Sequence, residues 1–180
     1  MSNPGNLDEQ DHHDCRAQAA RHLQQCAHRH RRQDRAAIAH GQSHLLADTC
    51  TLYLTTHNVH WNVTGPMFNT LHRMCMTPYT ELRNAVDPVA ERIRALGHAA
   101  PGSYAAYRQL TKLGDVPPVP PKAEEMERIL VKGNAAVAAT ARGLLPLTDK
   151  AGDQPTTDLL SARMDSHEKP AWMLRSRLEG

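Results

Sequence analysis

The sequence predicts an all-α fold, a four-helix bundle with one long crossover connection. Aromatic residues make up 4% of the chain, and strands depend on aromatic and β-branched residues more than helices do. Apolar residues recur at helical spacing in four long segments. A proline-rich stretch at residues 98–121 separates the second segment from the third. A connection of this length in a helical bundle usually crosses from one end to the other.

The first long helix is predicted from Asp34 to about Val63. Thr64-Gly65-Pro66 ends it, because glycine favours the left-handed conformation that closes a helix and proline cannot continue one. Its expected core positions are Ile38, Leu45, Leu46, Leu52, Val59 and Val63.

The second long helix is predicted from about Met67 to Leu96, ending at Gly97. A short helix at Tyr104–Leu110 is expected within the crossover. The third long helix is predicted over Ala123–Leu145, followed by the helix-ending residues Pro146 and Gly152. The fourth is predicted over Thr156–Leu178.

Residues 1–33 are predicted to form a flexible basic and His-rich tail, either mobile or as a frayed helix, and residues 34–180 the folded domain. The tail has too little apolar surface to offset the entropy cost of ordering it. Three roles stay open: a solvated extension, a basic arm that contacts DNA phosphates, and a histidine arm that collects zinc or copper. The charged and metal-binding side chains concerned are Arg16, Arg21, Arg29, Arg31, Arg32, His12, His13, His22, His28 and His30.

Composition excludes some classes of protein. The formal net charge is +2, which specifies no partner. There is no apolar run near 18 residues and no apolar signal region, so we expect a cytoplasmic protein without membrane contact. The cysteines lack C-x-x-C pairing and are expected to be free thiols. They are Cys15, Cys26, Cys50 and Cys75.

Four side chains form a candidate metal site: His60, His72, Asp87 and Glu91. Asp87 and Glu91 are four residues apart and share one helix face. His72 precedes Asp87 by 15 positions, which is about 22 Å along a helix axis. These two residues therefore share a metal ion only if they come from different chains, as a two-fold interface permits. Mixed nitrogen and carboxylate ligands suit iron or another divalent transition metal. On spacing alone, the two carboxylates also fit an ordinary solvated helix face.

Motifs across residues 34–178 resemble the Dps family, the miniferritins or DNA-binding proteins from starved cells. The resemblance rests on T-L-Y-L-T-T-H-N-V-H-W-N-V-T-G-P-M-F, with its specific H-W-N-V-T-G, and on A-E-R-I-R-A-L-G and A-P-G-S-Y-A. It implies a ferritin-like bundle and a hollow homododecamer. It also implies ferroxidase activity: the protein oxidises Fe(II), preferentially with hydrogen peroxide, and stores the ferric mineral. Such a protein protects DNA from oxidative damage and in some cases is associated with the nucleoid.

Carried over onto this chain, the resemblance places the catalytic iron ligands at His60 and His72 of one subunit and Asp87 and Glu91 of the other. It places Trp61 beside a mono-iron or di-iron centre. A helix-packing role for Trp61 is equally compatible.

The chain departs from the family pattern at several positions. Met76 stands where relatives usually carry a further carboxylate, and a thioether is a poor ligand for iron. Pro78, Pro88 and Pro170 fall inside predicted helices, each at a cost of about 3 kcal/mol. We therefore expect a ferroxidase of reduced rate. The alternative is a non-specific DNA-binding or architectural particle whose ferroxidase activity is weakened or lost.

Acidic residues near the start of the last helix have two interpretations. They could line acidic pores for iron entry, or they could cap the helix and oppose its dipole. The residues are Asp149, Asp153 and Asp158.

Overall fold

A computed structural model of the chain describes residues 8–179, with side chains from residue 31 onward. Within this range the chain forms five α-helices and no strand, which confirms the predicted all-α class. None of the helices in the described range is long and apolar enough to cross a membrane. The helices are α1 (Asp8–Asn62), α2 (Phe68–Ala95), α3 (Tyr104–Leu110), α4 (Ala123–Ala151) and α5 (Gln154–Leu178).

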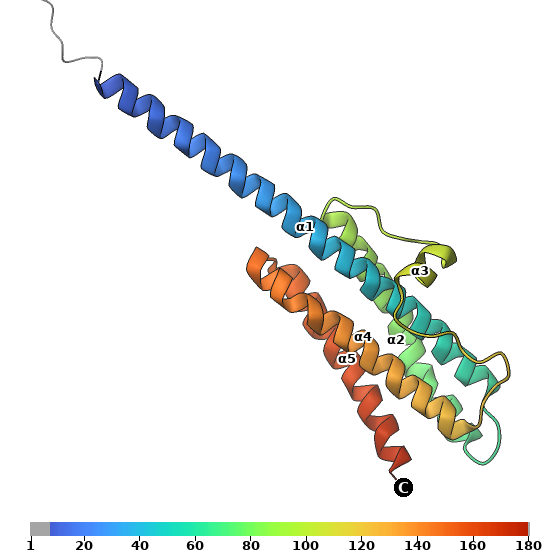
Figure 1. The fold of residues 1–180 in the computed structure, drawn as a ribbon. Helices are drawn as coiled ribbons and strands as arrows, with labels where there is room; N and C mark the ends of the chain where they lie inside the picture. The colour runs from blue at the N-terminus through green and yellow to red at the C-terminus, as the bar shows by residue number, and fades with distance from the viewer. Residues whose placement is uncertain (1–7, 180) are drawn as a thin grey trace, which may run out of the picture.

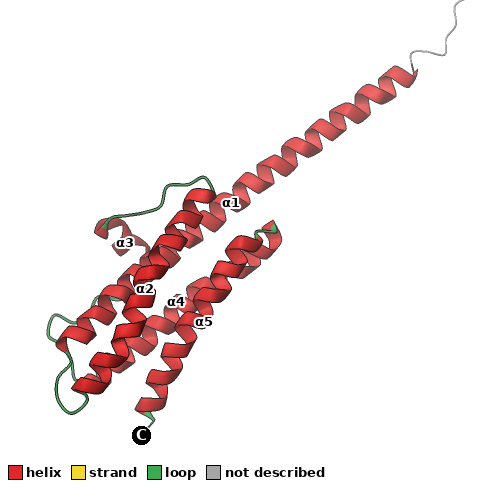
Figure 2. Cartoon of the chain, turned by 180° about the vertical axis from the view of Figure 1, so that it is seen from behind, coloured by secondary structure: helices red, strands yellow, loops and turns green. Residues whose placement is uncertain are grey.

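The four long helices form two antiparallel hairpins, α1 with α2 and α4 with α5 (Figure 1). The hairpins meet mainly through α1 and α4, whereas α2 and α5 touch little. After α2, the chain returns along the outside of the bundle and places α3 against α1 (Figures 1 and 2). This crossover makes α2 and α4 run in the same direction, as expected for the predicted bundle.

Helix α1 begins at Asp8, well before the predicted start at Asp34, and its N-terminal part extends beyond the bundle (Figure 1). Residues 1–7 and the side chains of residues 8–30 lie outside what the structure describes, so the division into a tail and a domain stays a prediction. The predicted core positions of α1 are confirmed. All six apolar side chains expected there are at most 1% exposed.

The predicted end of the third long helix at Leu145 is wrong. Helix α4 continues through Pro146 and ends at Gly152, which has a φ of +64°. Its last two turns pack against the start of α5, and Thr148 there is fully buried. This packing outweighs the proline cost of about 3 kcal/mol. Helices α2 and α5 also continue through their internal prolines, Pro78, Pro88 and Pro170.

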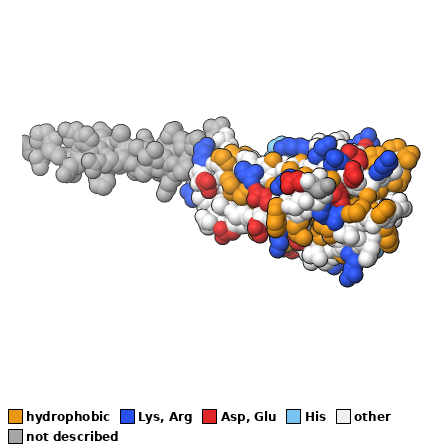
Figure 3. Space-filling view, turned by 90° about the horizontal axis from the view of Figure 1, so that it is seen from below, with side chains coloured by type: hydrophobic (Ala, Val, Ile, Leu, Met, Phe, Trp, Pro, Cys, Tyr) orange, Lys and Arg blue, Asp and Glu red, His pale blue; other side chains and the backbone are white. Residues whose placement is uncertain are grey.

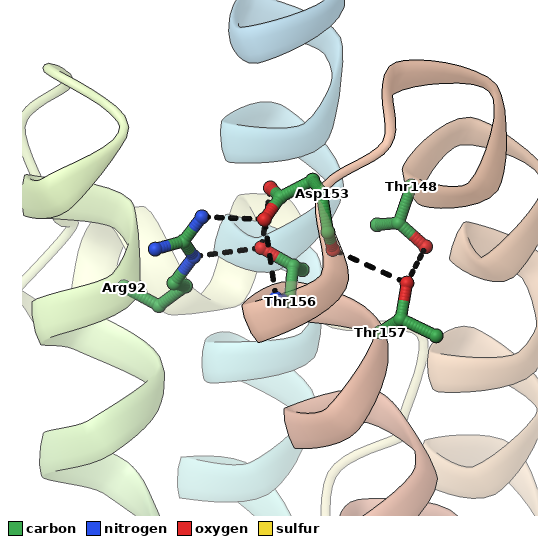
Figure 4. Close-up of polar contacts among 5 residues, drawn as sticks. All are labelled: Arg92, Thr148, Asp153, Thr156 and Thr157. Atoms are coloured by element: carbon green, nitrogen blue, oxygen red, sulfur yellow. Dashed lines mark hydrogen bonds and ion pairs between the residues drawn. The ribbon is translucent and has the colours of Figure 1, made fainter.

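A polar network fixes the corner between α4 and α5 (Figure 4). The Asp153 carboxylate caps α5 by accepting a hydrogen bond from the Thr156 amide, at 3.2 Å. Arg92 of α2 donates to Asp153 at 2.6 Å and to the Thr156 hydroxyl at 2.7 Å. Thr157 donates to the Thr148 hydroxyl at 2.8 Å. Asp153 therefore has the capping role, one of its two predicted interpretations.

The buried carboxylate of Asp48 anchors the crossover to the bundle. It accepts hydrogen bonds from the Thr111 hydroxyl at 2.9 Å, the Lys112 amide at 2.7 Å and the Thr140 hydroxyl at 2.8 Å. One side chain of α1 thus joins the crossover to α4. A buried carboxylate is stable only when its oxygens are paired in this way.

We expect Asp48→Asn to lower the free energy of unfolding by about 1–3 kcal/mol, because an amide has one acceptor oxygen where the carboxylate has two. Amide hydrogen exchange at residues 111–113 should become faster than in the wild type. Asp115→Asn is a matched control, since Asp115 is an exposed residue of the same crossover. Equal exchange in the wild type and Asp48→Asn would contradict the anchoring role.

Candidate metal centre

Two of the predicted ligands, His60 and His72, lie side by side. His60 is in the last turn of α1, and His72 is in the second turn of α2. Gly65, with a φ of +83°, helps to reverse the chain between them. The imidazole rings stack with centroids 3.7 Å apart and an interplanar angle of 19°. His60 therefore folds back beside His72, as the position of the turn predicted.

Reciprocal hydrogen bonds hold both rings. His60 Nδ1 lies 2.8 Å from the His72 carbonyl oxygen, and His72 Nδ1 lies 2.8 Å from the His60 carbonyl oxygen. A carbonyl oxygen only accepts, so each Nδ1 carries a proton, and in the neutral form of each ring the lone pair is on Nε2. Metal-binding histidines characteristically have this arrangement, in which the second nitrogen fixes the tautomer and the ring orientation. Both rings are thus prepared to bind a cation through Nε2.

A third histidine, His57, lies next to the pair. Its ring stacks on Tyr79 with centroids 4.2 Å apart, and its centroid is 6.5 Å from that of His60. Its buried Nδ1 has no hydrogen-bond partner. Burial, followed by the proximity of His60, lowers the pKa of His57 below its ordinary value, so the ring is neutral near pH 7. Sequence reasoning missed this residue. The available signal was its position three residues before His60, on the same face of a helix.

Asp87 and Glu91 lie far from the histidines of their own chain. Helix α2 is continuous from Phe68 to Ala95, so Asp87 is about 22 Å along its axis from His72. Both carboxylates are exposed. Neither forms an ion pair or hydrogen bond with another described side chain. In the described part of the chain, no three His, Cys, Asp or Glu residues are grouped to hold a metal ion. One chain alone therefore does not bring the four predicted ligands together.

Large apolar side chains surround the histidine pair and face outward. Trp61 is 63% exposed, and Phe68 and Met76 are each 47% exposed. Phe68 stacks on His72 with centroids 5.1 Å apart, and Trp61 lies 4.9 Å from His57. Trp61 does not pack into the core. Grouped exposed apolar side chains of this kind characterise surfaces that bind another protein.

The fold and this site define a class of protein. The Ferritin family, described as a ferritin-like domain, matches residues 43–180. The structure of a Dps protein from Vibrio cholerae O1, described as a member of the ferritin-like diiron-carboxylate proteins, superposes with a TM-score of 0.77 at 28% identity. The match covers 82% of this chain and 92% of that one. The chain is a ferritin-like protein.

Individual relatives show which family of ferritin-like proteins the chain resembles. The DNA protection during starvation protein of Agrobacterium fabrum is 34% identical over 134 residues, covering 74% of this chain and 83% of the relative. An uncharacterised low temperature-induced protein of Nostoc is 38% identical over 143 residues, covering 75% and 76%. The Dps structure from Bacillus brevis has a TM-score of 0.77 at 29% identity, covering 81% and 97%. The chain belongs to the Dps family.

Proposed function

We propose that this protein oxidises Fe(II) and stores the ferric product in a hollow dodecamer. Its ferroxidase centre lies between two subunits. His60 and His72 of one chain face Asp87 and Glu91 of the partner subunit. One observation carries this proposal: both histidines present a free Nε2, whereas the two unpaired carboxylates lie at the far end of α2. A two-fold axis that pairs opposite ends of α2 would create two equal centres.

The ligand types suit iron as the substrate. Neutral imidazole nitrogens and carboxylate oxygens both bind Fe(II), and the carboxylates offset the positive charge that increases on oxidation. With hydrogen peroxide the reaction balances as two Fe(II), one peroxide and two protons giving two Fe(III) and two waters. The protein's role is to hold the ions in position and to limit the access of water. The apolar side chains of Trp61 and Phe68 beside the histidines suit the second task.

Met76 reduces the expected rate. It lies one turn after His72, where the family usually supplies another carboxylate, and a thioether binds iron weakly. Anaerobic titration with Fe(II) followed by peroxide tests the function directly. We expect ferric absorbance to grow with protein present, and protein-bound ferric mineral to appear in electron micrographs. Absence of ferric absorbance with the wild type would rule out the ferroxidase.

A second function, binding to DNA, is supported by the arginines of the N-terminal segment and by the names of relatives such as the Agrobacterium fabrum protein. On the face of the bundle seen in Figure 3, both signs of charge are mixed with hydrophobic side chains. The candidates for phosphate contacts are the arginines grouped in the N-terminal segment. Multiple copies on one particle would bind without sequence preference.

We expect substitution of Arg16, Arg21, Arg29, Arg31 and Arg32 by Gln to weaken DNA binding at least about tenfold at moderate salt and to reduce its salt dependence. Gel shifts at two or more salt concentrations would measure both effects. Replacing an equal number of exposed arginines on the bundle provides the control. Equal binding by the tail variant and the wild type would exclude the arm.

A further inference from the structure

A second pair of histidines lies on α1, away from the candidate centre. His40 and His44 are one turn apart, and their Nε2 atoms are 3.3 Å from each other. The ring centroids are 4.8 Å apart with an interplanar angle of 89°. The two rings therefore meet through their Nε2 atoms, whereas the rings of His60 and His72 stack.

The separation of the Nε2 atoms fits a shared metal ion. Two nitrogens bound to one tetrahedral zinc ion at about 2.0–2.1 Å lie about 3.3 Å apart. Histidines one turn apart on a helix project from the same face, so the backbone already provides this spacing. Imidazole is a preferred ligand of zinc, copper and nickel.

The tautomer of His44 also suits metal binding. Its Nδ1 lies 2.6 Å from the carbonyl oxygen of Leu110, the last residue of α3. Because that oxygen only accepts, Nδ1 carries a proton, and in the neutral ring the lone pair is on Nε2. This is the outer hydrogen bond that orients metal-binding histidines in proteins. His40 is exposed and its ring is open to solvent.

We propose that His40 and His44 form a binding site for a divalent transition cation, with zinc as the representative ion. Water completes the coordination. The site is independent of the proposed ferroxidase centre and shares no residue with it. Since His44 Nδ1 also holds the end of α3, an ion bound here would fix the ring that already joins α1 to the crossover.

The competing explanation is a direct hydrogen bond from His40 Nε2–H to the lone pair of His44 Nε2, with no ion involved. Modification of histidine by diethyl pyrocarbonate, read out by peptide mass spectrometry, separates the two explanations in the full-length protein. A zinc ion on Nε2 blocks the modification of His40. We expect zinc to protect His40 in a concentration-dependent manner.

His44→Gln removes one proposed ligand and leaves the reporter His40 in place. We expect this variant to need about 10–100-fold more zinc for the same protection. His98, a half-buried histidine between α2 and α3, is the internal control, and zinc should leave its modification rate unchanged. Circular dichroism confirms that the variant retains its helices.

Three results would overturn the site: no protection of His40 in the wild type, equal protection in His44→Gln, or equal protection of His98. A crystal soaked in zinc gives a measurement that needs no variant. The proposal requires an anomalous peak within bonding distance of both Nε2 atoms. Zinc peaks at other places alone would contradict it.

Discussion

Particles assembled from two inactive variants are expected to recover about one quarter of the wild-type rate of Fe(II) oxidation. One variant is His60→Gln with His72→Gln, and the other is Asp87→Asn with Glu91→Gln. Particles made from either variant alone should be slower than the wild type by at least about 10–100-fold, because every centre lacks two ligands. Co-expression with different affinity tags yields the mixed particles.

The recovery follows from how a two-fold interface divides the ligands. In a pair of unlike subunits, one centre combines both defects and the other combines the intact histidines with the intact carboxylates. Random assembly makes half of the pairs unlike, and half of the centres in those pairs are complete. The expected fraction of active centres is therefore about one quarter.

A centre built within one chain predicts the opposite result. Neither variant chain carries a complete ligand set, so mixed particles would stay at the rate of the parent variants. Size-exclusion chromatography establishes that all particles have the same size. A mixture of separately assembled particles, combined just before the assay, controls for effects of mixing itself.

The sequence predicted most of the fold because the helix signals are local. Apolar periodicity located the core of α1, and Gly97 and Gly152 mark helix ends through their positive φ values. Pro146 misled the prediction for α4. Its cost is local, whereas the packing of Thr148 against α5 that offsets it depends on residues distant in the sequence. The helical conformation of residues 8–33 was only one of two expected alternatives, because these residues show no apolar periodicity.

The candidate site was predictable in part. Spacing along α2 indicated that one chain cannot bring His72 and Asp87 together, and the structure keeps them apart along one helix. The reciprocal hydrogen bonds, in which the Nδ1 atoms of His60 and His72 each bind the other residue's carbonyl oxygen, were not predictable. They depend on the geometry of the turn between α1 and α2. The close Nε2 atoms of His40 and His44 likewise depend on rotamers that spacing does not specify.

Acid is expected to destabilise the wild-type protein more steeply than a His167→Asn variant. His167 is 1% exposed, and burial, followed by the positive charge of Arg163, lowers its pKa to about 3. Its Nδ1 donates to Asn134 Oδ1 at 3.1 Å, and its Nε2 accepts from Arg163 Nη2 at 3.4 Å. The neutral ring is therefore the form that fits the core.

The direction of the effect follows from proton linkage. The pKa of His167 is lower in the folded state than the ordinary 6.5 of an unfolded chain, so the unfolded state binds the proton first. The stabilising contribution is complete above pH 6.5 and is lost as the pH falls from there toward about 3. Between pH 7.5 and 5 the loss is about 2 kcal/mol.

The hydrogen bonds around His167 connect this loss of stability to the contact between α2 and α5. Arg163 of α5 donates to both carboxylate oxygens of Glu81 in α2, at 2.5 and 2.7 Å. This link lies beside a cavity of about 420 Å³, with Glu81, Asn134 and His167 on its wall. A second positive charge beside Arg163 would weaken this polar contact between α2 and α5, so acid unfolding should begin there.

Chemical denaturation at several pH values and one fixed chain concentration measures the effect, because assembly contributes to apparent stability. His167→Asn replaces the titrating ring with a neutral side chain that retains hydrogen-bonding groups, and its unfolding free energy should change less between pH 7.5 and 5. His98→Asn removes a histidine outside the network and should behave like the wild type. Parallel pH profiles for the wild type and His167→Asn would show that the core tolerates a charged His167, contrary to the lowered pKa.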